Sequence, residues 1–158
     1  MHINSNWIKE FDAAHGHDFV SVGENGHWFL YADGAMRENS PYGAAIQPPK
    51  NRFERAKLIL QHREVWLARA VKALNDYQEK LLADDFAYTG QKYHLRELER
   101  LMAIVDERKK AVLIARRNKK RADPNYVPRA ERIRIENERS HNAAHREAFR
   151  EKVKRTQV

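Results

Sequence analysis

The chain has 158 residues, a formal net charge of +8 and no cysteine, which excludes disulfide bonds, thiolate metal sites and cysteine nucleophiles. Charged residues make up 33% of the chain and hydrophobic residues 42%, a balance that favours elongated helices with a thin core. The first residues lack an apolar signal-peptide core, and no run approaches the roughly 18 apolar residues of a membrane span. We therefore expect a soluble, cytoplasmic protein without membrane contact.

The charge is unevenly distributed along the chain. Residues 1–50 carry 3 basic and 6 acidic side chains, whereas residues 91–158 carry 20 basic and 10 acidic ones. A positive field of this kind attracts polyanions, which include nucleic acid, an anionic surface and an acidic protein. We therefore expect contact with a polyanion to lie in the second half of the chain.

A β-hairpin is predicted over residues 18–31, because two segments rich in β-branched and aromatic residues flank Asn25-Gly26. This dipeptide suits a two-residue type I′ turn, in which both central residues have positive φ. With that turn, Val22 lies opposite Phe29. Both faces of the hairpin are apolar, so we expect a short N-terminal helix to cover one face and the start of a long helix to cover the other.

Further turn signals follow the hairpin. Asp33-Gly34 is typical of a tight turn, and residues 37–50 contain three prolines and a glycine. That stretch also holds apolar side chains and lacks the Gly/Ser repetition of a flexible linker. We predict an ordered loop that wraps the head.

A long helix is predicted from Asn51 to about Ala83. Asn51 and Glu54 form the pattern of a capping box, in which each side chain bonds to the backbone N–H of the other. The helix contains no Gly or Pro, and its large residues recur every seven positions, which keeps one seam against a partner helix. The repeat consists of Phe53, Leu60, Leu67, Leu74 and Leu81, with Ala56, Ala70 and Tyr77 at the intermediate positions.

Two more helices are predicted, over residues 91–121 and from Pro128 toward Gln157. A short connection between the first and second long helices predicts an antiparallel helical hairpin, and we favour this internal packing over an intermolecular coiled coil. The third helix has little apolar content, so we expect it to lie on the hairpin, on another subunit or on a partner. The expected inward residues of the second helix are Leu95, Leu98, Met102, Val105 and Val112.

The sharpest charge cluster is residues 116–121, where five cations occupy six positions. Cations favour helix C-termini through the helix dipole, but five exceed what capping needs. Lys and Arg neutralise phosphates and release counterions, which gives salt-sensitive binding without sequence preference. On the third helix, five glutamates dilute the field and favour a salt-bridged face as the alternative. The candidate nucleic-acid contacts are Arg116, Arg117, Lys119, Lys120, Arg121, Arg134, Arg139, Arg146, Arg150, Lys152, Lys154 and Arg155.

Two groups of histidines have the residue types of a chemical site. His141 and His145 lie four apart and share a helix face, but the residues between them lack the glutamate of a metalloprotease motif. His15, His17 and Asp18 cluster in the head, where nothing supplies a nucleophile or an oxyanion donor. Surface histidines and a polar turn are the simpler interpretations, so we expect no catalytic residue, no metal and no cofactor.

These patterns predict a mainly α protein of the α+β class. A small head with one β-hairpin (residues 1–50) precedes a long antiparallel helical hairpin (51–122) and a basic C-terminal helix (123–158). Two functions are consistent with this organisation. The first is a non-enzymatic nucleic-acid-binding accessory protein that contacts the phosphate backbone of DNA or RNA. The second is a structural or assembly subunit of a larger complex, whose helices pack against a protein partner or in a homo-oligomer.

Overall fold

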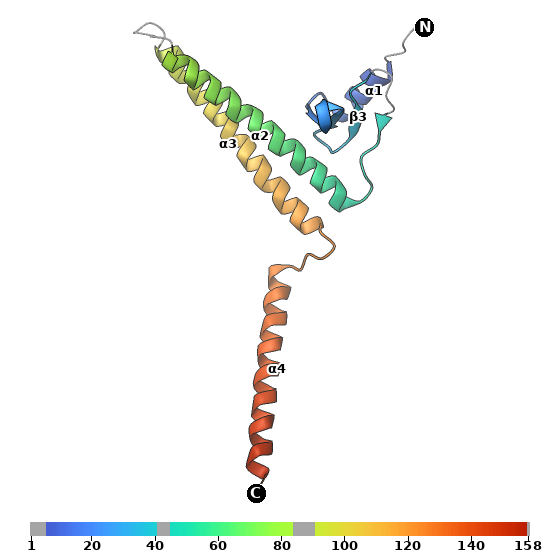
Figure 1. Cartoon of the computed structure of the whole chain (residues 1–158), viewed down its shortest axis with the longest axis vertical. Coiled ribbons are helices and arrows are strands. Elements are labelled where there is room, and N and C mark those ends of the chain that lie inside the picture. Colours follow the sequence, from blue (N-terminus) through green and yellow to red (C-terminus); the bar gives the residue numbers. More distant parts are fainter. Residues whose placement is uncertain (1–5, 41–44, 84–90, 158) are drawn as a thin grey trace. The chain divides into compact units, whose positions relative to one another are not determined.

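The computed structural model describes residues 6–40, 45–83 and 91–157. The chain divides into two compact units, residues 1–123 and residues 124–158. The first unit holds a short helix, a small sheet and a helical hairpin, and the second holds a single long helix (Figure 1). The predicted fold class is confirmed: a small head is followed by a helical hairpin and a C-terminal helix.

The head has more strands than the sequence predicted. Helix α1 (Asn6–His15) precedes a four-stranded antiparallel sheet in the order β1-β2-β3-β4. The predicted wrapping loop is therefore wrong in part, because two of its segments pair as strands; its residues 41–44 lie outside the described residues. The strands are β1 (Phe19–Val22), β2 (Trp28–Tyr31), β3 (Met36–Glu38) and β4 (Ala45–Ile46).

The β1–β2 pairing differs by one residue from the prediction. Val22 lies opposite Trp28 rather than Phe29, because the connection is a five-residue loop with a 3₁₀ turn at Glu24–Gly26. Asn25 and Gly26 do have positive φ, 56° and 66°, but they serve this longer loop. A one-residue shift changes which side chains share a face.

Two helices cover the two faces of the sheet, as predicted. On one face, Val20 and Leu30 form a buried cluster against which Leu58 of α2 (Arg52–Ala83) packs. On the other face, Phe11 of α1 packs against Tyr31, with ring centroids 5.0 Å apart. The β1–β2 hairpin is therefore covered on both faces, which compensates for the marginal stability of an isolated hairpin.

The predicted turn at Asp33-Gly34 is confirmed and lies against α2. The Asp33 carboxylate accepts a hydrogen bond from the Ala35 amide at 2.9 Å. Gly34 is buried with a φ of 89°, and an added Cβ would lie 3.3 Å from the Arg55 side chain. Both the left-handed backbone and the close approach of α2 require glycine at this position.

The helical hairpin consists of α2 and α3 (Gln91–Ala122), which pack against each other along their length (Figure 1). Asn51 caps α2 as predicted, because its side-chain oxygen accepts from the amides of Phe53 and Glu54 at 2.8 and 3.2 Å. The Glu54 carboxylate pairs with Lys57 at 3.0 Å. The packing of α2 against α3 within one chain is the arrangement that the heptad pattern favoured.

The expected inward positions hold for α2 but only in part for α3. Leu60 and Ala70 of α2 and Val105 and Val112 of α3 are buried, whereas Met102 is 52% exposed. Leu95, also expected inside, is 60% exposed. These two assignments were wrong because the buried seam of α3 follows the heptad through residues 98, 105 and 112, and positions 95 and 102 lie beside that heptad.

One inward position of α3 is occupied by a charge, which obscures the repeat in the sequence. Arg108 donates a hydrogen bond to the Trp66 carbonyl at 2.7 Å and lies 4.2 Å above the Trp66 ring. A guanidinium stacks on an indole face more readily than an ammonium does. The Trp66 ring therefore makes an arginine acceptable at a position that otherwise suits leucine.

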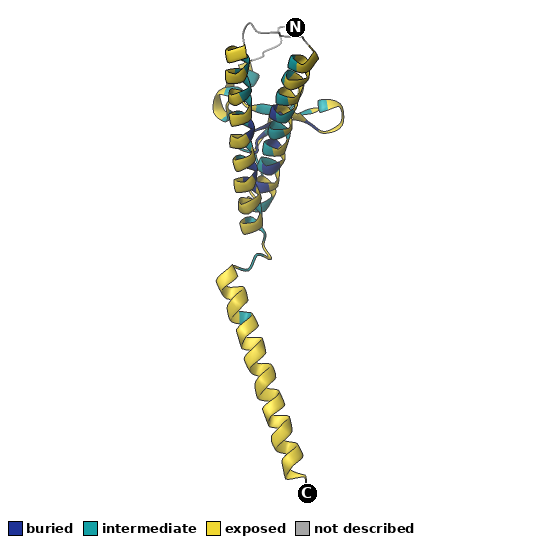
Figure 2. Cartoon of the chain, turned by 90° about the vertical axis from the view of Figure 1, so that its left-hand side faces the viewer, coloured by how far each residue is buried: buried dark blue, intermediate teal, exposed yellow. Residues whose placement is uncertain are grey.

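The second unit contains helix α4 (Arg129–Thr156), none of whose residues is buried (Figure 2). Pro128 is the N-cap of α4, so the helix begins at Arg129, one residue later than predicted. No described helix has the length and apolar content needed to cross a membrane.

Candidate nucleic-acid interface

Two of the five predicted cations at the end of α3 are either ion-paired or half-buried. Arg116 forms an ion pair with Glu64 of α2, at 3.4 Å. Lys119 is half-buried and lines a shallow depression together with Phe53 and Asp123. The Arg116 ion pair joins α3 to α2, and the partial burial of Lys119 leaves less of its side chain accessible to an external ligand.

The other three cations of this cluster remain accessible. Arg117, Lys120 and Arg121 are exposed and form no ion pair with any of the described residues. All three lie within the last two turns of α3, near the negative end of the helix dipole. Three of the five cations that the sequence singled out here are therefore both exposed and without an ion pair among the described residues.

Six of the seven predicted cations of α4 divide between two opposite faces of the helix, and Lys154 projects about 60° from Arg139. At about 100° per residue, Arg139, Arg146 and Arg150 project within about 40° of one another. Arg134, Lys152 and Arg155 project about 140–160° away from Arg139. A single ligand surface cannot contact both groups at once.

The first of these faces is the more strongly basic. Arg132, which the sequence prediction omitted, projects with Arg139, Arg146 and Arg150, and all four are exposed. Across an arc of about 100° around them, α4 carries no Asp or Glu but does carry Ile135. We call the four residues Arg132, Arg139, Arg146 and Arg150 the arginine face. The seven-residue spacing of its first three members was the sequence signal that identifies Arg132.

The arginine face keeps its charge. None of its four members forms an ion pair with a residue that the structure describes. Arg146 and Arg150 line an open depression together with Lys154 and two glutamates, Glu147 and Glu151. Lys154 pairs with Glu151 at 3.2 Å. Within α4, the donors of these four guanidinium groups are therefore not used in ion pairs.

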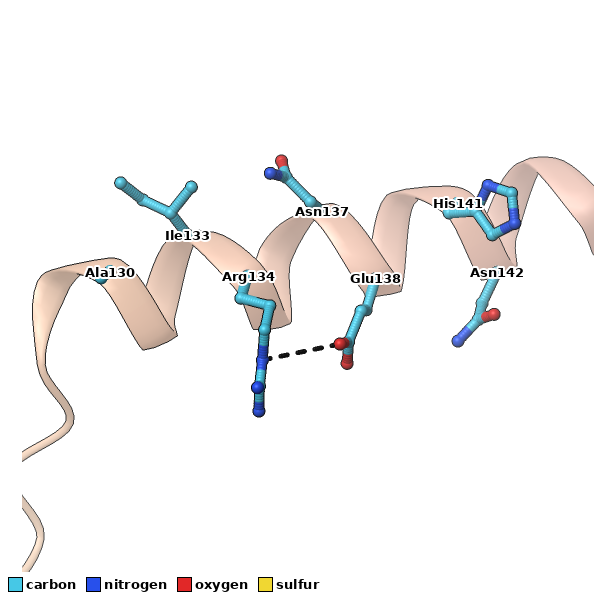
Figure 3. A pocket seen from close by; sticks show the side chains of 7 residues that line it. All are labelled: Ala130, Ile133, Arg134, Asn137, Glu138, His141 and Asn142. Carbon is cyan, nitrogen blue, oxygen red and sulfur yellow. Dashed lines mark ion pairs between the residues drawn. The ribbon is translucent and has the colours of Figure 1, made fainter.

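The opposite face of α4 is partly neutralised. Figure 3 shows Arg134 reaching one turn along the helix to Glu138, and the two groups are 3.6 Å apart. His141 lines the same open depression as Arg134 and is exposed (Figure 3); its ring centroid is 5.6 Å from that of His145. No group of three metal-ligating side chains occurs among the described residues.

The predicted histidine cluster of the head is dispersed. His15 donates to the Asp33 carboxylate at 2.6 Å, whereas His17 is exposed. The Asp18 carbonyl accepts from His62 of α2 at 2.9 Å. Burial alone would raise the pKa of Asp33, but hydrogen bonds from His15 and the Ala35 amide lower it. His15 is thus held by Asp33, and Asp18 is engaged through its backbone rather than its carboxylate, so these residues do not converge on one reactive centre.

A buried polar network that the sequence did not predict lies at the centre of the head. The Tyr31 hydroxyl donates to Asp12 and accepts from Arg37 at 2.7 Å. Arg37 is 6% exposed and lies 4.6 Å from the centroid of the Phe29 ring. Burial, together with the hydrogen bond to Asp12, raises the pKa of Tyr31 to about 12. The neutral Tyr31 phenol thus links Asp12 to Arg37 and has a structural role in the head.

Comparison of the chain with protein-family models, with curated proteins and with solved structures gives no match.

Proposed function

We propose that the protein binds nucleic acid without catalysing a reaction, and that the arginine face of α4 makes the main contact with the phosphate backbone. The observation that carries this proposal is the alignment of Arg132, Arg139, Arg146 and Arg150 on an acid-free arc of an exposed helix. Arg117, Lys120 and Arg121 of α3 provide a second, smaller set of contacts.

The geometry of the arginine face suits a repeating polyanion. Arg132 and Arg150 are 18 residues apart, so the face extends for about 27 Å along α4. The guanidinium group presents several N–H donors in a plane and binds phosphate oxygens in pairs. An α-helix also fits the major groove of a duplex. A nucleic-acid backbone of this length would meet positive charge at several points along α4 rather than at one.

The neighbouring side chains extend the proposal to single strands. Phe149 is 67% exposed and projects beside the arginine face. An exposed aromatic ring next to cations can stack on an unpaired base, a contact that tolerates any sequence. The face is therefore expected to accept both duplex and single-stranded nucleic acid, with little preference for sequence.

Fluorescence anisotropy with labelled duplex DNA, single-stranded DNA and RNA tests this function. We expect micromolar or tighter binding at low salt, and a log–log dependence of affinity on salt whose slope corresponds to several phosphates, about 0.9 per phosphate for a duplex. The absence of binding to all three probes at low salt would contradict the proposal.

A second candidate function is assembly into a protein complex. It is favoured by large apolar side chains that α3 leaves exposed, among them Leu95, Met102 and Leu113, because exposed apolar patches are typical of protein contacts. Light scattering over a wide concentration range and pull-down from a lysate separate the two functions. A clean monomer that recovers no partner would count against assembly.

A further inference from the structure

An exposed apolar stripe runs along α3 beside its contact with α2. Leu95, Met102 and Leu113 are 60%, 52% and 53% exposed. Their spacings of seven and eleven residues bring them within about 20° of one another around the helix axis. The buried residues Val105 and Val112 lie on a different side of α3. The stripe is therefore not part of the hairpin core.

Between Leu95 and Arg117, the charges beside the stripe are separated by sign along the helix; Lys92, which projects on the same side, lies beyond the N-terminal end of this stretch. Glu99 and Asp106 lie toward its N-terminal end, and Lys109, Lys110 and Arg117 lie toward its C-terminal end. All five project within about 60° of the stripe and are exposed. Within the described part of the chain, none of them forms an ion pair. The surface is complementary to itself when the helix direction is reversed.

We propose that this stripe is an interface between two copies of the chain, in which α3 pairs with α3 of the second copy in an antiparallel orientation about a twofold axis. In the register that we assign, Met102 lies against Leu113 of the second copy. Asp106 then lies opposite Lys109 and Lys110. A twofold axis repeats each of these contacts, so two apolar and two ionic pairs form at once.

The same register places the remaining charges in favourable positions. Glu99 lies opposite Arg117 of the second copy, and the aliphatic part of Lys120 lies over Leu95. A parallel pair would instead set Asp106 against Asp106 and Lys109 against Lys109, which is unfavourable. Charge complementarity therefore selects the antiparallel orientation, and a second copy is the partner that it fits.

This inference rests on the assembly function and not on nucleic-acid binding. Arg117 and Lys120 belong both to this interface and to the smaller set of proposed nucleic-acid contacts. Asp106, Lys109 and Lys110 belong only to the interface, so variants at these three positions separate the two. Loss of self-pairing with retained nucleic-acid binding, or the reverse, is an interpretable result.

Disulfide trapping in the full-length chain tests the orientation, because the chain has no cysteine of its own. Met102→Cys and Leu113→Cys proteins are oxidised separately and as a mixture. We expect a covalent dimer in the mixture only, since two copies of position 102 lie about 16 Å apart in this register, too far for a disulfide. Trapping within either single variant, or in none of the samples, would overturn the assignment.

Charge reversal tests the contacts themselves. We expect the wild-type chain to dimerise in sedimentation experiments between about 1 µM and 1 mM, a range that covers weak interfaces. Asp106→Lys alone and Lys109→Glu/Lys110→Glu alone should be monomeric, because each places like charges opposite each other. Their mixture should form a heterodimer, since both ionic contacts are then restored.

The neighbouring residue supplies the control. Glu107→Lys makes the same change in net charge as Asp106→Lys but projects about 120° from the stripe, so it should dimerise as the wild type does. Circular dichroism checks that every variant retains its helices. A wild-type chain that stays monomeric, a dimer that withstands both reversals, or a mixture that stays monomeric would each overturn the proposal, even if a pull-down recovered another protein.

Discussion

Individual side chains hold the head of this protein together and join it to the helical hairpin. Tyr31 joins Asp12 and Arg37 inside the head, and His62 joins α2 to the backbone of Asp18. Both side chains are fully buried. Removing one member of a buried polar network leaves its partners unsatisfied, which costs more than the hydrogen bond itself contributes.

Replacement of Tyr31 by Phe should reduce the free energy of unfolding by about 1–3 kcal/mol. The phenol oxygen is the acceptor for the Arg37 Nε donor, and without it this guanidinium loses a buried partner. Urea denaturation followed by tryptophan fluorescence measures the change. Tyr93→Phe is the control, because Tyr93 is 67% exposed; equal effects of the two substitutions would contradict the assigned role.

His62 should make the stability depend on pH. Burial, and then the charge of Arg63, lower its pKa below the ordinary 6.5, and its Nδ1 accepts from Arg63 at 3.0 Å. Below pH 6.5 the unfolded chain therefore takes up a proton that the folded chain does not. The free energy of unfolding should fall as the pH drops below 6.5, by at most about 1.4 kcal/mol per pH unit, until the lowered pKa is reached.

Denaturant titrations of the wild type and His62→Gln between pH 5 and pH 8 (a window of about 1.5 units on either side of the ordinary value) check this expectation. The substituted protein should lose the part of the pH dependence that His62 causes. His145→Gln on α4 should keep it, because that ring is exposed. An identical pH dependence in the wild type and His62→Gln would show that His62 does not titrate as described.

At the scale of elements, local signals in the sequence predicted the helices well and the pairing of strands less well. Asn51 marks the start of α2 because its side chain caps the helix by itself, without help from the rest of the fold. Asn25-Gly26 favours positive φ in more than one kind of loop, so the dipeptide did not determine the strand register.

The seam of α3 shows a second limit of the sequence. Val112 and Leu113 are neighbours of similar hydrophobicity, yet they are 3% and 53% exposed. Arg108 interrupts the heptad that distinguishes them, and its acceptance depends on the Trp66 ring of another helix. Contacts between helices determine both the burial of Val112 and the acceptance of Arg108, and such contacts cannot be read from a single sequence.

The assigned seam predicts different outcomes for these neighbours. Val112→Ala should lower the free energy of unfolding by about 1–3 kcal/mol, because it leaves a cavity in the hairpin core. Leu113→Ala should change it by less than about 0.5 kcal/mol when both are measured at a concentration where the chain is monomeric. A larger effect of Leu113→Ala would mean that the seam is misassigned.

At the scale of the whole molecule, the two units differ in how they are stabilised. The first has a buried core, whereas α4 buries none of its residues. A chain that ends at Asp123 should therefore unfold with the same free energy as the full chain, within about 0.5 kcal/mol. Denaturation followed by tryptophan fluorescence measures this directly, since all three tryptophans precede position 124. A marked loss of stability would show that residues 124–158 support the first unit.

The sequence alone could indicate where the cations of the candidate site lie along the chain. It could not indicate which of them are accessible to a ligand, because Arg116 is paired with Glu64 of another helix. On α4 the division into two faces follows from helix geometry and was open to prediction once the helix was assigned. This division identifies which of the basic residues share one side of α4 and can contact the same ligand.

The most direct test of the nucleic-acid proposal compares two triple variants of the full chain by anisotropy across a range of salt. One carries Arg139→Gln, Arg146→Gln and Arg150→Gln, and the other carries Arg134→Gln, Lys152→Gln and Arg155→Gln. Both remove three charges from α4, so they differ only in which face loses them. We expect the first to weaken duplex binding about ten- to hundredfold and to reduce the salt slope by about 3, while the second changes the slope by less than about 1. Equal losses in the two variants, or wild-type binding by the first, would contradict recognition through the arginine face.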